Sequence, residues 1–271
     1  MMREEGRDSF IRGKIAREVE ATHQSKLLIS SETAYGTYPT RKMMSVLGGM
    51  KDIDIKALFY FRRQDLFLES LAKQRGKTGN LAGGYLPFIY ARRDKADYAG
   101  FLRAMRTRFN DIAWSAHLYD RAHLHRQDAV SDLFHRIGLD GVEVATQTRM
   151  VANRTPSLPF IAALSECGFS DPSERRALLH SALAHSPATF FKTADVLTAE
   201  QRAELMDGYR ACNAAMSDEV GVDLVKLFHD DVAWDGVSGA ISDSDEWDWA
   251  VQAARLEIGR LTKLARLDAA A

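Results

Sequence analysis

The chain has 271 residues, of which 46% are hydrophobic and 27% are charged. This composition supports a packed core and excludes a disordered chain. The formal net charge is −1, from 36 basic and 37 acidic residues, which argues against a general nucleic-acid-binding protein. The two cysteines, Cys167 and Cys212, lie far apart without metal-ligand spacing. We therefore expect no disulfide framework and predict that both are small core residues.

The N-terminal sequence is charged and lacks the apolar segment of a secretory signal. No stretch of the sequence approaches the length and apolarity of a membrane span. These two observations predict a cytoplasmic protein without a membrane span.

The first predicted elements are a helix and a strand. Residues 8–24 are predicted to be helical because Ile11, Ile15 and Val19 recur every four positions. Residues 26–29 (KLLI) predict a short buried strand, which ends in two serines and Glu32. Glu32 allows two interpretations. It is either a general base at the edge of a sheet, or a helix cap or ion-pair partner with only a structural role.

Residues 57–79 combine a strand, two arginines and a helix. The apolar run 57–61 predicts a strand, Arg62 and Arg63 follow it directly, and Ser70 lies on the second turn of the helix that comes next. This order of elements is typical of phosphate sites at the carboxyl edge of a sheet, where a guanidinium and a helix N-terminus both face the ligand. We expect Arg62 and Ser70 to bind one phosphate group. Arg63 either shares this role or points into solvent, and solvent is the favoured alternative.

The rest of the chain predicts one more strand and several helices. The glycine-rich residues 76–84 form either a lid over a ligand or an exposed connection. The third strand is predicted within residues 112–119. Helices are predicted at residues 40–47, 98–109 and 128–137, after the start signals at Asp171 and Thr198, and from residue 243 or 244 onward. The helix after Thr198 is expected to hold both Leu205 and Met216 on one face. The last helix is expected to have an apolar face formed by Trp247, Val251, Ala254, Ile258 and Leu261. Alternating strands and helices followed by a helical tail predict a single α/β domain, with its core at 25–150 and a helical part at 151–271.

The remaining polar clusters favour structural roles. His123 and His125 are two positions apart, which without further ligands does not make a metal site, and His117 is expected to be structural. The acidic residues between 230 and 248 suit a solvated loop and a helix start, where negative charge is favourable. We expect no bound metal.

Three segments resemble the sulfotransferases that use 3′-phosphoadenosine 5′-phosphosulfate (PAPS), especially the bacterial carbohydrate-type branch. The segment FYFRRQDLFLES resembles the 3′-phosphate motif of that family, and LLISSE resembles its preceding strand. The segment HLYDRAHLHRQDAVSDLFHRIGLDG resembles a later strand, turn and helix. With RMVANRTPS and LTAEQRAEL, the resemblance covers about residues 25–225.

This resemblance implies a P-loop nucleotide-kinase-like fold, with a three-layer parallel sheet and a largely helical C-terminal part. It implies that PAPS is the co-substrate and that Arg62 and Ser70 bind its 3′-phosphate. It also implies that Glu32 is the base in a transfer of the sulfuryl group to a hydroxyl, on a small molecule or a glycan.

One part of the family pattern is missing. Members have an early strand and a Lys-Ser/Thr-Gly-Thr-Thr loop that binds the 5′-phosphosulfate and supplies a catalytic lysine. Here Gly13 and Lys14 lie in a helical pattern instead. We expect an N-terminally truncated fold, with exposed apolar surface at residues 27–29 or 58–61 and a tendency to self-associate. Two functions stay open: a sulfotransferase, and a catalytically impaired relative that binds a nucleotide or glycan without turnover.

Overall fold

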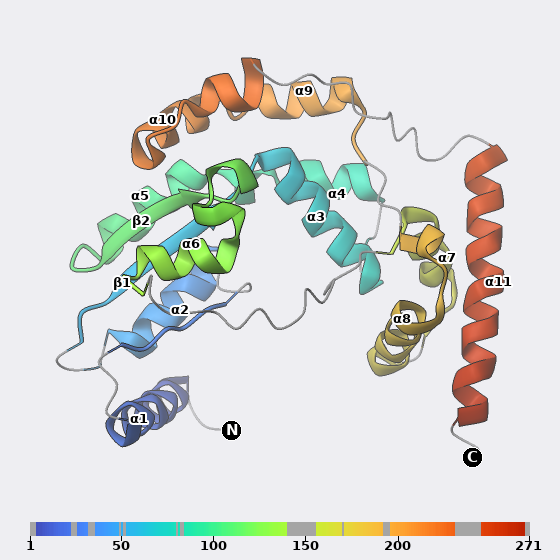
Figure 1. The fold of residues 1–271 in the computed structure, drawn as a ribbon, viewed down its shortest axis with the longest axis horizontal. Helices are drawn as coiled ribbons and strands as arrows, with labels where there is room; N and C mark the ends of the chain where they lie inside the picture. The colour runs from blue at the N-terminus through green and yellow to red at the C-terminus, as the bar shows by residue number, and fades with distance from the viewer. Residues whose placement is uncertain are drawn as a thin grey trace. The chain divides into compact units, whose positions relative to one another are not determined.

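The computed structural model describes residues 4–22, 26–31, 36–48, 50, 53–79, 81, 84–139, 156–169, 171–191, 196–230 and 245–268 (Figure 1). They form an α/β structure that is mostly helical and contains a small parallel sheet. The chain divides into two compact units. The first consists of Met1–Phe61, Asp97–Tyr119 and Ala211–Asp223, and the second of Arg62–Ala96, Asp120–Arg210 and Leu224–Ala271.

The sheet of the first unit has two parallel strands among the described residues, β1 (Lys56–Phe61) and β2 (Ala113–Leu118). Lys56 pairs with Ala113 and Phe61 with Leu118. In β2 every second residue is buried, as expected for a strand with one face on the core. The strands predicted at 57–61 and within 112–119 are therefore confirmed.

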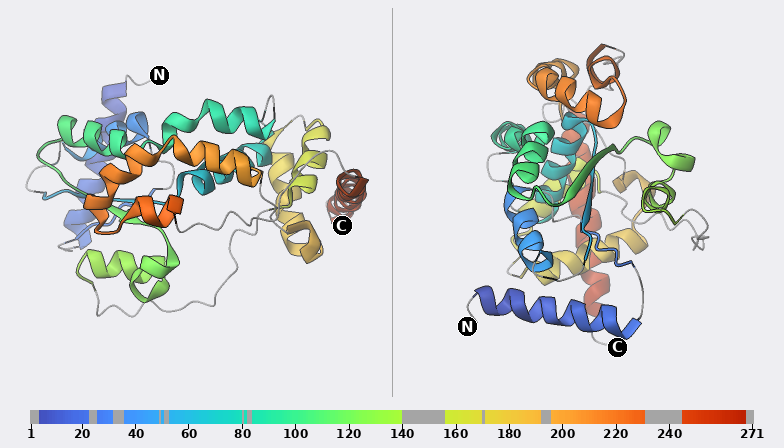
Figure 2. Two further views of the ribbon diagram at one scale, coloured as in Figure 1. Left: turned by 90° about the horizontal axis from the view of Figure 1, so that it is seen from above. Right: turned by 90° about the vertical axis from the view of Figure 1, so that its left-hand side faces the viewer.

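Helices of the first unit pack against this sheet and against one another (Figure 2). On α5 (Tyr98–Arg108), the rings of Tyr98 and Phe101 pack against Phe59 of β1, with centroids 5.9 and 5.1 Å apart. These contacts place aromatic rings on the apolar face of the strand, where burial stabilises both elements. The other helices of this unit are α1 (Glu4–Thr22), α2 (Thr37–Leu47) and α10 (Arg210–Val220).

The prediction of a strand at residues 26–29 is wrong. These residues have no strand assignment, and Leu27, Leu28 and Ile29 are 54%, 49% and 41% exposed. An apolar run becomes a strand only when a neighbouring backbone completes its hydrogen-bond ladder, and the sheet within the described residues contains only β1 and β2. The run therefore remains without a pairing strand in the described part of the chain.

The second unit is built from helices. They are α3 (Gln64–Lys77), α4 (Tyr85–Ala91), α6 (Ala129–Arg136), α7 (Leu158–Glu166), α8 (Pro172–His185), α9 (Ala199–Asp207) and α11 (Asp245–Asp268), joined in part by short 3₁₀ turns and the π-helix η6 (Lys226–Asp230). Helices α7, α8 and α11 pack around one core (Figure 1). The predicted apolar face of α11 is confirmed, because it contributes four buried residues to this core: Val251, Ala254, Ile258 and Leu261.

Local start signals predicted the helix N-termini well. Asp171 caps α8 by accepting a hydrogen bond from the Ser173 N–H, and Asp128 caps α6 in the same way through Ser131. Thr198 and Gln201 form the expected capping box of α9. Each of these signals needs only residues within one turn, which explains why the sequence alone revealed them.

Three local predictions need correction. Leu205 and Met216 were expected on one helix. The helix instead ends at Gly208, so Leu205 lies on α9 and Met216 on α10. Cys167 is exposed rather than in the core, while Cys212 is half-buried. The glycine-rich stretch from residue 76 begins inside α3, because Gly76 is a buried helical residue. Within the described ranges, no helix combines the length and apolarity needed to cross a bilayer.

Candidate functional site

The predicted phosphate site lies at the start of α3, in the second unit. Arg62 is half-buried in the short connection after β1, and Ser70 is exposed on the second turn of α3. Neither side chain forms a hydrogen bond or ion pair within the part of the chain that the structure describes. Both groups therefore remain available to an anionic ligand. Glu32, the predicted base, lies outside the described residues.

The prediction for Arg63 is wrong. Its guanidinium forms a bidentate pair with Asp65, with Nε 2.8 Å from Oδ1 and Nη2 2.9 Å from Oδ2. Asp65 is fully buried, and a buried carboxylate needs a cationic partner. This requirement holds Arg63 against the protein. The sequence did not reveal it, because an acidic residue at the start of a helix carries no local sign of whether it will be buried.

A second buried arginine completes the cluster. Arg202 of α9 donates to Asp65 and also to Glu69 of α3, where Nη2 lies 3.0 Å from Oε1. The same Glu69 oxygen accepts hydrogen bonds from the N–H groups of Val196 and Leu197, at 2.8 and 2.9 Å. The network therefore ties α3 to the segment that leads into α9. Sequence reasoning missed it, although two acidic residues four positions apart on an otherwise buried helix face were a usable signal.

Among the residues of this buried cluster and Arg62, cationic side chains outnumber carboxylates. Arg62, Arg63, Arg202 and Lys73 are cationic, and the two carboxylates are those of Asp65 and Glu69. The carboxylates are already bound to Arg63, Arg202 and Lys73, so the charge of Arg62 is the one left uncompensated within the described residues. A partly desolvated guanidinium beside a helix N-terminus attracts phosphate and sulfate groups.

A histidine of the π-helix lies within electrostatic range of this region. Burial lowers the pKa of His229, and the nearby cations Arg210 and Arg63 lower it further, while Asp230 and Asp207 oppose the change. A lowered pKa favours the neutral imidazole at physiological pH. His229 therefore adds little positive charge to this end of α3 unless an anion binds there.

The other histidines considered in the sequence, His117 and His123, make contacts with neighbouring side chains. His117 of β2 shares a hydrogen bond of 3.0 Å with Ser115 and lies against the ring of Tyr60, as expected for a structural residue. His123 lies 3.4 Å from a carboxylate oxygen of Asp120. Searching the described ranges reveals no group of three or more His, Cys, Asp or Glu side chains placed to hold a metal.

Two further basic residues, Lys77 and Arg154, and the acidic stretch 230–248 contribute less to a site. The backbone carbonyl of Lys77 accepts a hydrogen bond from Arg175, and Lys77 lies in the last turn of α3, far along the helix from Arg62. Arg154 and most of the acidic stretch 230–248 lie outside the described residues. Of the acidic residues that are described, Asp245, Glu246 and Asp248 occupy the first turn of α11 as predicted, while Asp230 ends η6 and pairs with Arg210.

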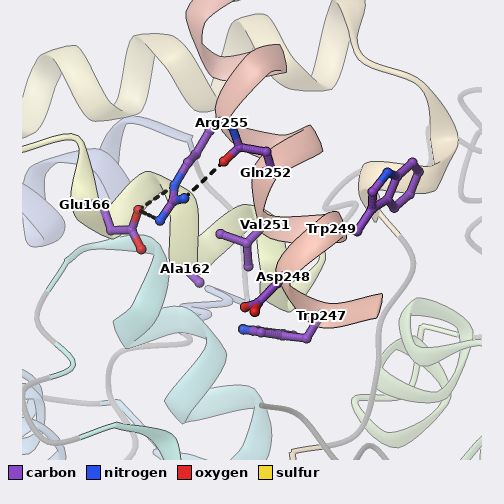
Figure 3. Close-up of a pocket in the computed structure, with 8 residues that line it drawn as sticks. All are labelled: Ala162, Glu166, Trp247, Asp248, Trp249, Val251, Gln252 and Arg255. Carbon is purple, nitrogen blue, oxygen red and sulfur yellow. Dashed lines mark hydrogen bonds and ion pairs between the residues drawn. The ribbon is translucent and has the colours of Figure 1, made fainter. Parts of the chain in front are cut away.

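The structure also contains a hollow that the sequence did not reveal. It has a volume of about 620 Å³ and lies between α7 and α11 (Figure 3). Its lining includes two indole rings, those of Trp247 and Trp249, and an ion pair between Arg255 and Glu166. The pair Trp-x-Trp in a polar context was the only sequence signal for this feature.

Comparisons with family models, with curated proteins and with solved structures found no match to this chain.

Proposed function

We propose that this protein binds PAPS through the 3′-phosphate of its adenosine, with Arg62 and Ser70 as the phosphate ligands. Under this proposal it is a sulfotransferase-like protein with a P-loop nucleotide-kinase-like fold. Its reaction would move a sulfuryl group from PAPS to a hydroxyl group, on a small molecule or on a carbohydrate.

One observation carries the proposal. Two arginines follow β1, and only the second is bound to a carboxylate, while the half-buried Arg62 has no partner within the described residues. A guanidinium held partly out of water is stabilised when an anion binds to it. The hydroxyl of Ser70 on the same unit supplies a second donor, and the motif resemblance indicates that the anion is a 3′-phosphate.

Binding is better supported than turnover. The sequence contains no Lys-Ser/Thr-Gly-Thr-Thr loop, which in the resembling family stabilises charge on the leaving phosphate. Removing donors of this kind typically lowers the rate by two to three orders of magnitude. The second candidate function is therefore a protein that binds the nucleotide without turnover.

Calorimetry with adenosine 3′,5′-bisphosphate tests the phosphate site. We expect Arg62→Ala to weaken binding by roughly ten- to hundredfold, because a hydrogen bond to a charged group contributes about 1.5–3 kcal/mol. Ser70→Ala should weaken binding by a few-fold. Arg75→Ala is the matched control, since it removes an equal charge from an exposed position near the end of the same helix.

Equal affinities for the wild type and Arg62→Ala would refute the phosphate role. An equal loss in Arg62→Ala and Arg75→Ala would mean that only general electrostatic attraction is involved. Incubating the protein with radiolabelled PAPS and an acceptor mixture then separates the two candidate functions, because only a sulfotransferase transfers the label.

A further inference from the structure

The hollow between α7 and α11 has a polar stripe on one wall (Figure 3). Asp248, Gln252 and Arg255 follow one another at spacings of four and three along α11, so they lie on one face of the helix. Ala162 and Glu166 of α7 form the opposite wall, again four positions apart. Both helices belong to the second unit and pack against each other through the core that they share with α8.

Two indole rings border this stripe. Successive residues of a helix are separated by about 100° around its axis, so Trp247 and Trp249 lie on opposite sides of Asp248 (Figure 3). Trp247 packs partly against the core cluster, which fixes its ring. Trp249 is 75% exposed, and its ring is in contact with no other ring among the described residues. The hollow thus combines one anchored and one open aromatic surface.

Some polar groups of the stripe form hydrogen bonds within the described residues, and others do not. Arg255 donates to Glu166 through Nε at 2.8 Å and lies 2.6 Å from it through Nη2, while its Nη1 donates to the amide oxygen of Gln252 at 3.1 Å. These contacts orient the Gln252 amide and leave its nitrogen as a donor. The carboxylate of Asp248 has no hydrogen-bond partner within the described residues and remains an acceptor.

We infer that this hollow is a binding site for a neutral glycan. Sugar rings present an apolar C–H face that packs on indole rings, and hydroxyl groups that pair with carboxylates and amides, which are the two kinds of group found here. Asp248 and Glu166 outnumber Arg255, so the hollow is net negative and disfavours anionic ligands such as nucleotides or sulfated sugars. The inference rests on the proposed function only in taking carbohydrate as the acceptor class.

Calorimetry without any donor nucleotide tests this site. The probes are neutral oligosaccharides with different linkages (maltotetraose, cellotetraose and chitotetraose) and a sulfated heparin tetrasaccharide as the anionic comparison. We expect at least one neutral probe to bind more tightly than the heparin fragment. Trp249→Ala should weaken that binding about tenfold, because it removes an aromatic stacking surface. Trp249→Tyr should retain most of it.

Leu256→Ala is the matched control, because Leu256 is 70% exposed on the same helix and does not line the hollow. It should leave glycan binding unchanged. The inference is overturned if no neutral probe binds, if the heparin fragment binds more tightly, or if Trp249→Ala binds as the wild type does.

The two proposals can fail separately. Arg62→Ala should leave glycan binding intact, and Trp249→Ala should leave the binding of adenosine 3′,5′-bisphosphate intact. Loss of both activities in either variant, with the helical circular-dichroism signal retained, would overturn the assignment of two separate sites.

Discussion

At the level of single residues, burial decides which charges the protein uses for itself. Arg62 and Arg63 are adjacent and chemically identical, yet only Arg63 is bound to a buried carboxylate. Arg202 is almost fully buried and bridges Asp65 and Glu69, so its charge is also committed to the fold. A buried charge without its partner is strongly unfavourable, which makes this cluster a sensitive point of stability.

Replacing Arg202 by methionine should destabilise the protein by about 3 kcal/mol, because Asp65 and Glu69 would lose a buried partner. Chemical denaturation monitored by circular dichroism measures the change. Arg210→Met is the control, since Arg210 pairs with Asp207 and Asp230 at exposed positions and should change stability by less than about 1 kcal/mol.

Adding Glu69→Gln to Arg202→Met should recover part of the loss, because it removes a buried carboxylate that would keep only the more distant Lys73, at 3.9 Å, as a cationic partner. Equal stabilities of Arg202→Met and Arg210→Met would show that the buried cluster has no special role.

At the level of elements, close helix contacts depend on one small residue. Gly76 is buried on α3, and a Cβ atom there would lie 2.7 Å from the Tyr85 hydroxyl of α4 and 2.8 Å from Ile161 of α7. Burial also raises the pKa of Tyr85 to about 12, since the phenolate is disfavoured away from water. The three helices can approach this closely only because the residue has no side chain.

Gly76→Ala should therefore destabilise the second unit by about 1–2 kcal/mol, although alanine has the better helix propensity by about 1 kcal/mol. Thermal unfolding provides the measurement. Gly259→Ala on α11 is the matched control, because a Cβ there meets nothing within 4 Å, and this variant should gain stability. A stabilised Gly76→Ala protein would contradict the packing argument.

At the level of the whole molecule, the sheet is small and apolar groups remain uncovered. Two paired strands are marginal without further cover, and Leu27, Leu28 and Ile29 are exposed in a segment that pairs with neither strand of the described sheet. Such segments offer both apolar surface and backbone groups to other chains. The formal net charge of −1 provides little repulsion between molecules.

We therefore expect the purified protein to self-associate as its concentration rises. Light scattering coupled to size exclusion should show a mass that increases with concentration, and Leu27→Ser with Leu28→Ser should reduce this increase. Leu256→Ser serves as the comparison, because it removes a single exposed leucine from a regular helix. A wild-type protein that stays monomeric at every concentration would contradict the expectation.

The sequence by itself determined the features that depend on neighbouring residues. The capping box at Thr198, the cap at Asp171 and the buried face of α11 follow from hydrogen bonds and helical periodicity within a few residues, and all three were predicted. The apolar runs at 57–61 and within 112–119 also predicted the two strands, although the pairing of these strands with each other is a tertiary feature.

Only the tertiary structure decided what depends on partners far along the chain. It placed no strand at residues 26–29, bound Arg63 to the carboxylate cluster through Asp65, and brought Glu166 to Arg255 across 89 positions. The physical reason is the same in each case. Burial and pairing are properties of the assembled chain, and an arginine or an apolar run carries no local signal of whether its partner will be there.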